Sequence, residues 1–204
     1  MNILAVVLIT TYVLCLWGYH YLYFFLTERS GVTTQRNLIN DAVLSWFEIA
    51  LEEKEYLLVI HQIRNVIMAV TFLATTVVLL LGLIFGLSAS GLPGNVNRLT
   101  HPLWLMAITL IYSFFNFLLC LRHFTRITFL IRSAPEKLQA ITGDPAEVYL
   151  SNLFIRGNRE YTLGRRSMLY GMVVLTWFLS PVVFLILTLV MTAVFIMSYD
   201  FRVR

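Results

Sequence analysis

Four long apolar segments alternate with more polar segments along the chain, and they set the expected fold. A helix needs about 20 apolar residues to cross the hydrocarbon core of a bilayer, and each segment is close to that length or longer. We therefore predict an all-α, polytopic membrane protein in which residues 1–204 form a single domain. The four predicted transmembrane helices cover approximately residues 3–26, 66–89, 103–121 and 168–198.

The two long polar segments, 33–64 and 122–167, are expected to be helical and to lie in the cytoplasm. Neither Gly nor Pro occurs between residues 32 and 81 or between residues 103 and 134. The usual helix breakers are therefore missing where the second and third transmembrane helices leave the membrane. We expect both helices to extend into a cytoplasmic helical layer.

One face of the segment 33–64 is apolar with the spacing of an amphipathic helix. This face is expected to cover the apolar end of the third helix beyond Arg122. In the other polar segment, Ser133 and Asp144 begin sequences typical of a capped helix N-terminus. The residues of the apolar face are Ala42, Trp46, Ile49, Tyr56, Ile60 and Ile63.

Composition and charge support a membrane location and give an orientation. Hydrophobic residues make up 59% of the chain and charged residues only 13%, whereas about a quarter of the residues in a soluble domain are charged. Of the 15 Lys and Arg residues, twelve lie in the two long polar segments or at their ends and three lie elsewhere. Since basic loops stay in the cytoplasm, we predict a multi-pass protein of the inner (cytoplasmic) membrane with both termini on the non-cytoplasmic side.

Two stripes of small residues are expected to pack helices together. Small side chains let helix backbones approach closely in lipid, and such residues share one face of the second and of the fourth predicted span. The stripe on the second span contains Thr71, Thr75, Gly82 and Gly86, and that on the fourth contains Gly164, Ser167 and Gly171.

The third span carries a polar stripe of Tyr112, Asn116, Cys120 and His123. An amide deep in an apolar run must find a partner, so Asn116 is expected to face the interior of the bundle or a polar cavity. Two interpretations stay open, a packing contact between helices and a side chain that lines a solute path.

Basic residues are expected to gather at the cytoplasmic membrane surface. Arg122 follows the third span directly, where a long side chain reaches the head groups at little cost. Arg64, Arg165 and Arg166 are placed at the same level. They would contact phospholipid phosphates or form a pocket for an anion between the helices, and the net charge of +4 indicates this kind of contact rather than nucleic acid.

Three histidines, His20, His61 and His123, lie toward the cytoplasmic ends of the spans. Three imidazoles could bind a metal ion, and two could hold a haem iron. None has the close helical spacing to another His or Glu that is typical of a metal site, so we expect no metal and no cofactor; His20 and His123 are the candidates if one binds. A nucleophile elbow, a phosphate loop and an HExxH motif are missing, and we expect no catalytic residues.

Four stretches of the sequence resemble one known family. They are GYHYLY (18–23), RNVIMAVTFLATT (64–76), FFNFLLCLRHF (114–124) and REYTLGRRSMLYGMVVLTWFLSP (159–181). They resemble the domain of unknown function family numbered 599, four-span membrane proteins of bacteria and plants. The resemblance implies a four-span architecture and no particular activity, and His61 lies outside the family pattern. The recurring positions that it implies are His20, Arg64, Asn65, Thr71, Arg122, His123, Gly164, Arg166, Tyr170 and Pro181.

These observations lead to one functional hypothesis and two alternatives. We expect a non-enzymatic homo-oligomer that forms a conduit for ions or small solutes, because packing faces, a polar stripe and a basic mouth occur together. An accessory or scaffold subunit of a larger membrane complex is the first alternative. A haem- or metal-binding redox protein that uses His20 and His123 is the second.

Overall fold

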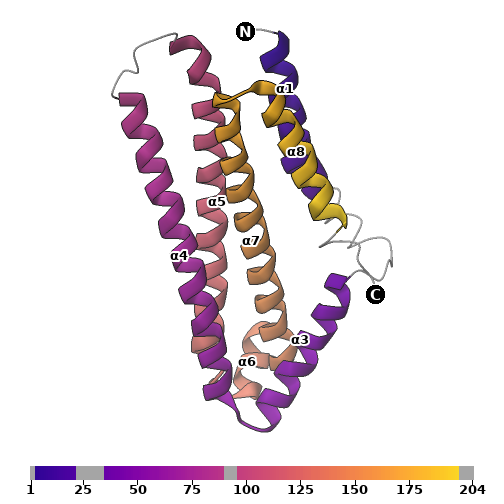
Figure 1. Ribbon diagram of the computed structural model, residues 1–204. Coiled ribbons are helices and arrows are strands. Elements are labelled where there is room, and N and C mark those ends of the chain that lie inside the picture. The colour runs from indigo at the N-terminus through magenta and orange to yellow at the C-terminus, as the bar shows by residue number, and fades with distance from the viewer. Residues whose placement is uncertain (1–2, 22–34, 90–95, 198–204) are drawn as a thin grey trace. The chain divides into compact units, whose positions relative to one another are not determined.

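The computed structural model describes residues 3–21, 35–89 and 96–197, and all regular structure in these residues is helical (Figure 1). The predicted all-α class is therefore confirmed. The elements are α1 (Ile3–Val13), the π-helix η1 (Leu14–Gly18), α3 (Gln35–Glu52), α4 (Tyr56–Ala89), α5 (Val96–Leu130), α6 (Pro135–Thr142), α7 (Ala146–Val174), the 3-10 helix η2 (Leu175–Phe178) and α8 (Pro181–Phe195).

Three helical stretches in the described residues are long and apolar enough to cross a membrane. They are Ile3–Tyr21, Tyr56–Gly86 and His101–Leu130, and they overlap the first three predicted spans. The apolar helix α8 has only 15 residues, which is about 23 Å at 1.5 Å per residue and shorter than a hydrocarbon core of about 30 Å. A count of four crossings therefore stays a prediction.

Helices α4 and α5 continue well past the spans predicted for them. They contain 34 and 35 residues, which corresponds to about 51 Å and 53 Å of helix. Each is therefore longer than a hydrocarbon core of about 30 Å.

The helical segment predicted at 33–64 is not one helix, because α3 ends at Glu52 and α4 begins at Tyr56. The chain turns at Glu53–Glu55, between α3 and α4, although neither Gly nor Pro is present there. Lys54 takes a positive φ of 57°, which costs a non-glycine residue roughly 1–2 kcal/mol. The amide of Glu55 donates to the carbonyl of Ala50 at 3.0 Å and closes the end of α3. The apolar face predicted for one helix is therefore divided between two.

The two predicted helix starts between α5 and α7 lie where expected, but one cap differs. Helix α6 begins at Pro135 with Ala134 as its N-cap residue, and no side chain caps its first turn. Ser133 is therefore not the cap. Proline fits the first helical turn because the missing N–H would have no partner there in any case. Gly143, with φ of 83°, ends α6, and α7 begins at Ala146, just after Asp144.

The described chain divides into two compact units, and each is considered by itself below. The first unit consists of Met1–Asn37, Leu79–Tyr112 and Arg166–Arg204. The second consists of Leu38–Val78 and Ser113–Arg165.

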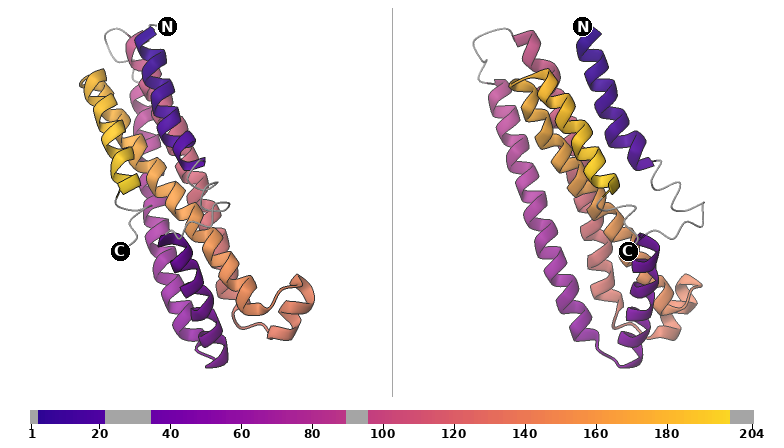
Figure 2. Two further views of the ribbon diagram at one scale, coloured as in Figure 1. Left: turned by 90° about the vertical axis from the view of Figure 1, so that its right-hand side faces the viewer. Right: turned by 45° about the vertical axis from the view of Figure 1, so that its right-hand side comes forward.

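In the first unit, the predicted span 168–198 is not one continuous helix. Helix α7 ends at Val174, η2 follows, and Ser180 caps α8 by accepting a hydrogen bond from the amide of Val182 at 3.3 Å. Figure 2 shows α8 running back alongside the end of α7. The hydroxyls of Tyr170 and Thr192 lie 2.6 Å apart, whereas 22 residues of continuous helix would separate them by about 33 Å.

This reversal also removes the basis for one predicted location. The prediction that the C-terminus lies on the non-cytoplasmic side requires residues 168–198 to cross the membrane once. The described residues instead form two antiparallel segments within this range. Helix α8 packs against α1 in the first unit, where the ring centroids of Tyr12 and Phe184 lie 5.7 Å apart in a stacked arrangement.

The second unit has an aromatic core. Phe154 of α7 lies 6.1 Å from both Trp46 and Phe47 of α3 and 5.4 Å from Phe124 of α5, measured between ring centroids. Phe47 and Phe124 are fully buried. Such edge-on and tilted contacts stabilise a core beyond the burial of apolar area.

The reversal at Pro181 can be tested with a double-mutant cycle. Tyr170→Phe and Thr192→Val each remove one partner of the hydrogen bond, so their effects on the unfolding free energy in detergent should be coupled by about 0.5–1.5 kcal/mol. Tyr170→Phe combined with Thr76→Val, a residue that bonds only to its own helix at the Phe72 carbonyl, should be additive. Additive effects in both pairs would contradict the hairpin of α7 and α8.

Candidate functional site

A cluster of buried and half-buried polar side chains lies in the first unit, and we call its members the polar cluster. They come from α1, from the helical residues that follow η1, and from α5, α7 and α8. Most large neighbours are aromatic, so the cluster is polar at its centre and apolar around it. Its members are Tyr12, His20, Thr109, Arg166, Tyr170 and Thr192.

The π-helix η1 positions His20. Backbone hydrogen bonds in a π-helix span five residues rather than four, and here the amide of Tyr19 donates to the carbonyl of Leu14. π-bulges of this kind occur often at functional sites because they re-aim the side chains that follow. His20 is 4% exposed, and its Nδ1 contacts the carbonyl oxygen of Leu16. Its ring lies 6.3 Å from that of Tyr170 at an interplanar angle of 76°.

The two tyrosines of the cluster use the same hydrogen-bonding arrangement. Thr109 donates its hydroxyl proton to the carbonyl of Leu105 at 2.8 Å, and Tyr12 donates to Thr109 at 3.1 Å. Thr192 likewise donates to the carbonyl of Thr188 at 2.8 Å. Because a threonine hydroxyl has one proton, Tyr170 must be the donor in its 2.6 Å bond to Thr192. Both tyrosine oxygens thus keep lone pairs that can accept a further hydrogen bond.

Arg166 brings a positive charge into this cluster. The residue is 3% exposed, and its guanidinium lies 5.0 Å from the centroid of the Phe195 ring. An arginine above an aromatic face is stabilised by the negative charge of the ring face. A buried cation beside hydroxyl and imidazole groups is an arrangement that can bind and orient an anion or a polar solute.

Within the second unit, Arg165 does not lie at the level expected for it. In the second unit, the hydroxyl of Ser113 donates to the carbonyl of Gly164 at 2.7 Å. Ser113 is about midway between Leu103 and Arg122 along α5. Arg165, the next residue, therefore lies level with the middle of the predicted third span rather than with Arg122. Its contact with head groups or an anion stays a prediction.

Arg122 and His123 belong to a different group of residues, in the second unit. Arg122 is exposed and His123 half-buried, and the charges of Arg126, Arg156 and Arg122 all act on the His123 imidazole. The Nδ1 atom of His123 is buried and has no hydrogen-bond partner among the described residues. A Cβ placed on Gly157 would lie 3.3 Å from the His123 Cβ. Arg64 is exposed on α4.

Asn116 faces the protein interior. It is 5% exposed, and Ser113 and Cys120 of the same helix are fully buried. The described polar face of α5 in the second unit is therefore covered by protein.

The small residues of α7 and α4 have different surroundings. A Cβ on Gly164 would lie 2.8 Å from the Phe117 ring, and one on Gly171 would lie 3.0 Å from Leu110; Ser167 is also buried. On α4, by contrast, Gly82 and Gly86 have no atom within 4 Å of such a Cβ. Thr71 and Thr75 are exposed and donate to carbonyls of their own helix at 2.8 and 2.9 Å.

The two candidate ligands for a metal or haem are placed in different units. His20 belongs to the first unit and His123 to the second. Among the residues that the structure describes, no three His, Cys, Asp or Glu side chains gather as a metal ion would require. The absence of a cofactor stays an expectation.

Sequence reasoning missed several members of the polar cluster. Tyr12, Thr109 and Thr192 are single polar residues inside apolar runs, and each satisfies its hydroxyl partly within its own helix or through one distant partner. Their positions in predicted spans were the available signal, since a polar group in hydrocarbon needs a partner. Which partner each one finds depends on tertiary contacts.

Comparison with known proteins gives a family and no activity. The sequence model of the family described as "Protein of unknown function, DUF599" matches residues 7–204. No curated protein and no solved structure matches the chain. The resemblance inferred from the four sequence stretches is confirmed.

The contact at Gly164 gives a stability prediction with a matched control. Gly164→Ala places a methyl group against the Phe117 ring and should lower the unfolding free energy by about 1–3 kcal/mol. Gly86→Ala, in open surroundings, should leave it unchanged or raise it by up to about 1 kcal/mol through helix propensity. Denaturant unfolding in detergent, followed by circular dichroism, measures both. Equal effects would show that α7 does not approach α5 this closely.

Proposed function

The chain belongs to the DUF599 family, and from this premise we propose that it is a non-enzymatic integral membrane protein that assembles as a homo-oligomer and forms a conduit for ions or small solutes. The observation that carries the proposal is the buried Arg166 in the polar cluster of the first unit. We place the protein in the inner membrane with its N-terminus on the non-cytoplasmic side, following the distribution of basic residues.

An ionisable residue within the membrane is costly and usually marks a path for ions or solutes. Arg166 comes two residues after Gly164. The Gly164 carbonyl accepts a hydrogen bond from Ser113, which lies in the middle of the predicted third span. His20 and Tyr170 lie in the same cluster as Arg166, and both belong to the positions that the family resemblance singled out. The cluster offers a positive charge, an imidazole and hydroxyl oxygens, which are the groups a polar solute needs in place of water.

Several copies would be required for a conduit. Within the second unit, the polar face of α5 is buried at Ser113, Asn116 and Cys120, so it supports packing rather than a water-filled path inside one copy. A conduit would then form where copies meet.

The stripe of Thr71, Thr75, Gly82 and Gly86 on α4 supports contact between copies. Among the buried residues of α4 are Ile63, Val70, Val77 and Ile84, at intervals of seven positions. Ile84 is about half a helical turn away from Gly82 and Gly86 of the stripe. The stripe therefore points away from the side of α4 that its own chain covers. Small residues on a membrane helix favour close packing against another helix, and a second copy of α4 is the partner we propose.

Exposed basic residues support contact with phospholipids. Arg64 and Arg122 are exposed, and each lies within a helical stretch that is long and apolar enough to cross a membrane. Arginine at such a position binds anionic head groups.

The conduit can be tested by reconstitution into vesicles. We expect measurable flux of monovalent ions or small solutes through the wild-type protein. Arg166→Gln should change the rate or the ion preference at least tenfold, because the buried charge is lost. Arg132→Gln removes the same charge at an exposed position and should change neither. Absence of flux in a panel of cations, anions and neutral solutes, or identical flux in both variants, would overturn the proposal.

The oligomer can be tested independently of flux. Native mass spectrometry in a mild detergent should show more than one copy of the wild-type chain. Gly82→Trp should shift the population to monomers, whereas Leu83→Trp, at a residue 58% exposed beside the stripe, should preserve it. A strictly monomeric wild-type protein would contradict homo-oligomer assembly. Co-purification of a different protein at fixed stoichiometry would instead favour an accessory subunit.

A further inference from the structure

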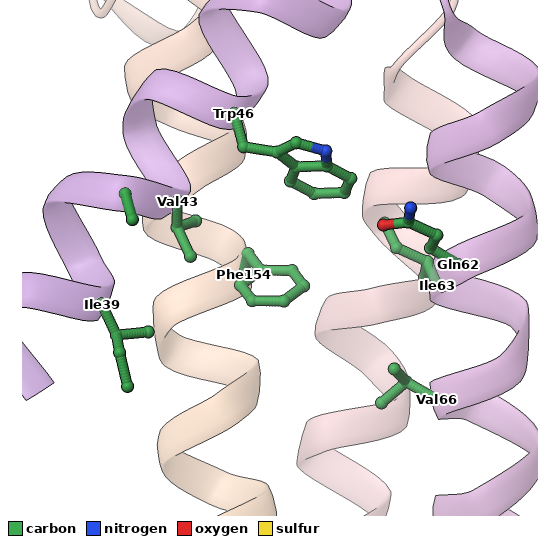
Figure 3. Close-up of a pocket in the computed structure, with 8 residues that line it drawn as sticks. Ile39, Val43, Trp46, Gln62, Ile63, Val66 and Phe154 are labelled. Carbon is green, nitrogen blue, oxygen red and sulfur yellow. The ribbon is translucent and has the colours of Figure 1, made fainter.

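The second unit contains an apolar pocket of about 360 Å³ between α3, α4 and α7 (Figure 3). Its volume lies within the range of roughly 300–1,000 Å³ that is usual for small-molecule sites. None of the residues that line it is charged. They are Ile39, Ala42, Val43, Trp46, Gln62, Ile63, Val66 and Phe154.

The lining defines the chemistry of the occupant. Figure 3 shows Trp46 and Phe154 on one side of the pocket and Gln62 with Ile63 on the other, all directed toward the common space. Only the Gln62 amide and the Trp46 indole N–H offer hydrogen bonds. A charged or strongly hydrated molecule would lose water contacts without replacement, whereas a hydrocarbon chain would lose nothing by leaving water.

The walls are fixed by contacts outside the pocket. The ring of Phe154 is held by Trp46, Phe47 and Phe124. The turn at Lys54 brings α3 back beside the start of α4, and this reversal creates the space. A cavity lined by apolar side chains does not hold water well, and it can bind an apolar molecule.

The position of the pocket indicates which apolar molecule is at hand. Gln62, Ile63 and Val66 belong to the stretch Tyr56–Gly86, which is long and apolar enough to cross a membrane. One wall of the pocket is thus continuous with a membrane-crossing helix, next to which phospholipid chains are the most concentrated apolar molecules. Gln62 is exposed and adds a polar group to this wall of the pocket.

We propose that the pocket binds one acyl chain of a membrane phospholipid, with the chain between Trp46, Phe154 and Val66. The Gln62 amide then lies at the open end, where it can donate a hydrogen bond to an ester carbonyl of the lipid. This site depends on membrane association and does not depend on the conduit or on Arg166.

Fluorescence quenching by a brominated lipid tests the site. In a variant whose only tryptophan is Trp46, with Trp17, Trp104 and Trp177 changed to Phe, dibrominated phosphatidylcholine is titrated in dodecyl maltoside micelles. We expect saturable quenching with one lipid per chain. Ala42→Phe in this background fills the pocket and should weaken binding at least tenfold. Ala69→Phe, at an exposed residue of α4 in the same unit, should not.

A second filling variant, Val66→Phe, keeps the test valid if Ala42→Phe does not fold, as judged by circular dichroism. Gln62→Leu should retain the chain but weaken binding severalfold through loss of the amide. Non-saturable quenching, or equal binding in Ala42→Phe, Val66→Phe and Ala69→Phe, would overturn the proposal. If dibromostearate saturated the quenching at a lower concentration than the brominated phospholipid, the ligand would be a free fatty acid and not a phospholipid. A failure of this test with ion flux intact would leave the conduit standing.

Discussion

The close approach of α7 to α5 at glycine is the constraint on which much of the structure depends. Gly157, Gly164 and Gly171 recur every seven residues, and a side chain of α5 lies against each. The partners are Phe124, Phe117 and Leu110, which also recur every seven residues and run in the opposite direction. A methyl group on any of these glycines would lie within about 3 Å of its partner, so large residues on one helix require glycine on the other.

This contact decides where the polar groups of α7 lie. Ser113 can reach the carbonyl of Gly164 because no side chain separates the two helices there. The same approach fixes the level of Arg165, and Arg166 follows it into the polar cluster. In the first unit, Gly171 lies against Leu110. Gly171 directly follows Tyr170 on α7, and Leu110 directly follows Thr109 on α5. Within the first unit, the contact at Gly171 thus brings α7 and α5 together beside Tyr170 and Thr109, two members of the polar cluster.

The satisfaction of polar groups is the second physical requirement. In apolar surroundings an unsatisfied hydroxyl costs more than the hydrogen bond contributes when made. Tyr12 and Tyr170 each bond to a threonine whose own proton is used by its helix. The tyrosine hydroxyls thus bond to threonine rather than to a charged group. The polar cluster also contains the Arg166 guanidinium and the His20 imidazole. That is the physical basis on which a solute path is proposed.

The sequence by itself determined the helical class, the apolar helices that overlap the first three predicted spans, the starts of α6 and α7, and the family. These properties follow from local composition and periodicity, which act over one or two helical turns. The packing role of Gly157 could also have been predicted from the sequence, because Gly157 lies seven residues before Gly164, as Gly164 does before Gly171. Only the tertiary structure decided the turn at Lys54, the reversal before Pro181 and the burial of Arg166. At Lys54, packing of α3 against α4 and α7 offsets a positive φ that no local signal indicated. At Pro181, the apolar sequence predicted one continuous span. The contacts of Tyr170 with Thr192 and of Tyr12 with Phe184 instead favour a reversal, because they join residues far apart in the chain.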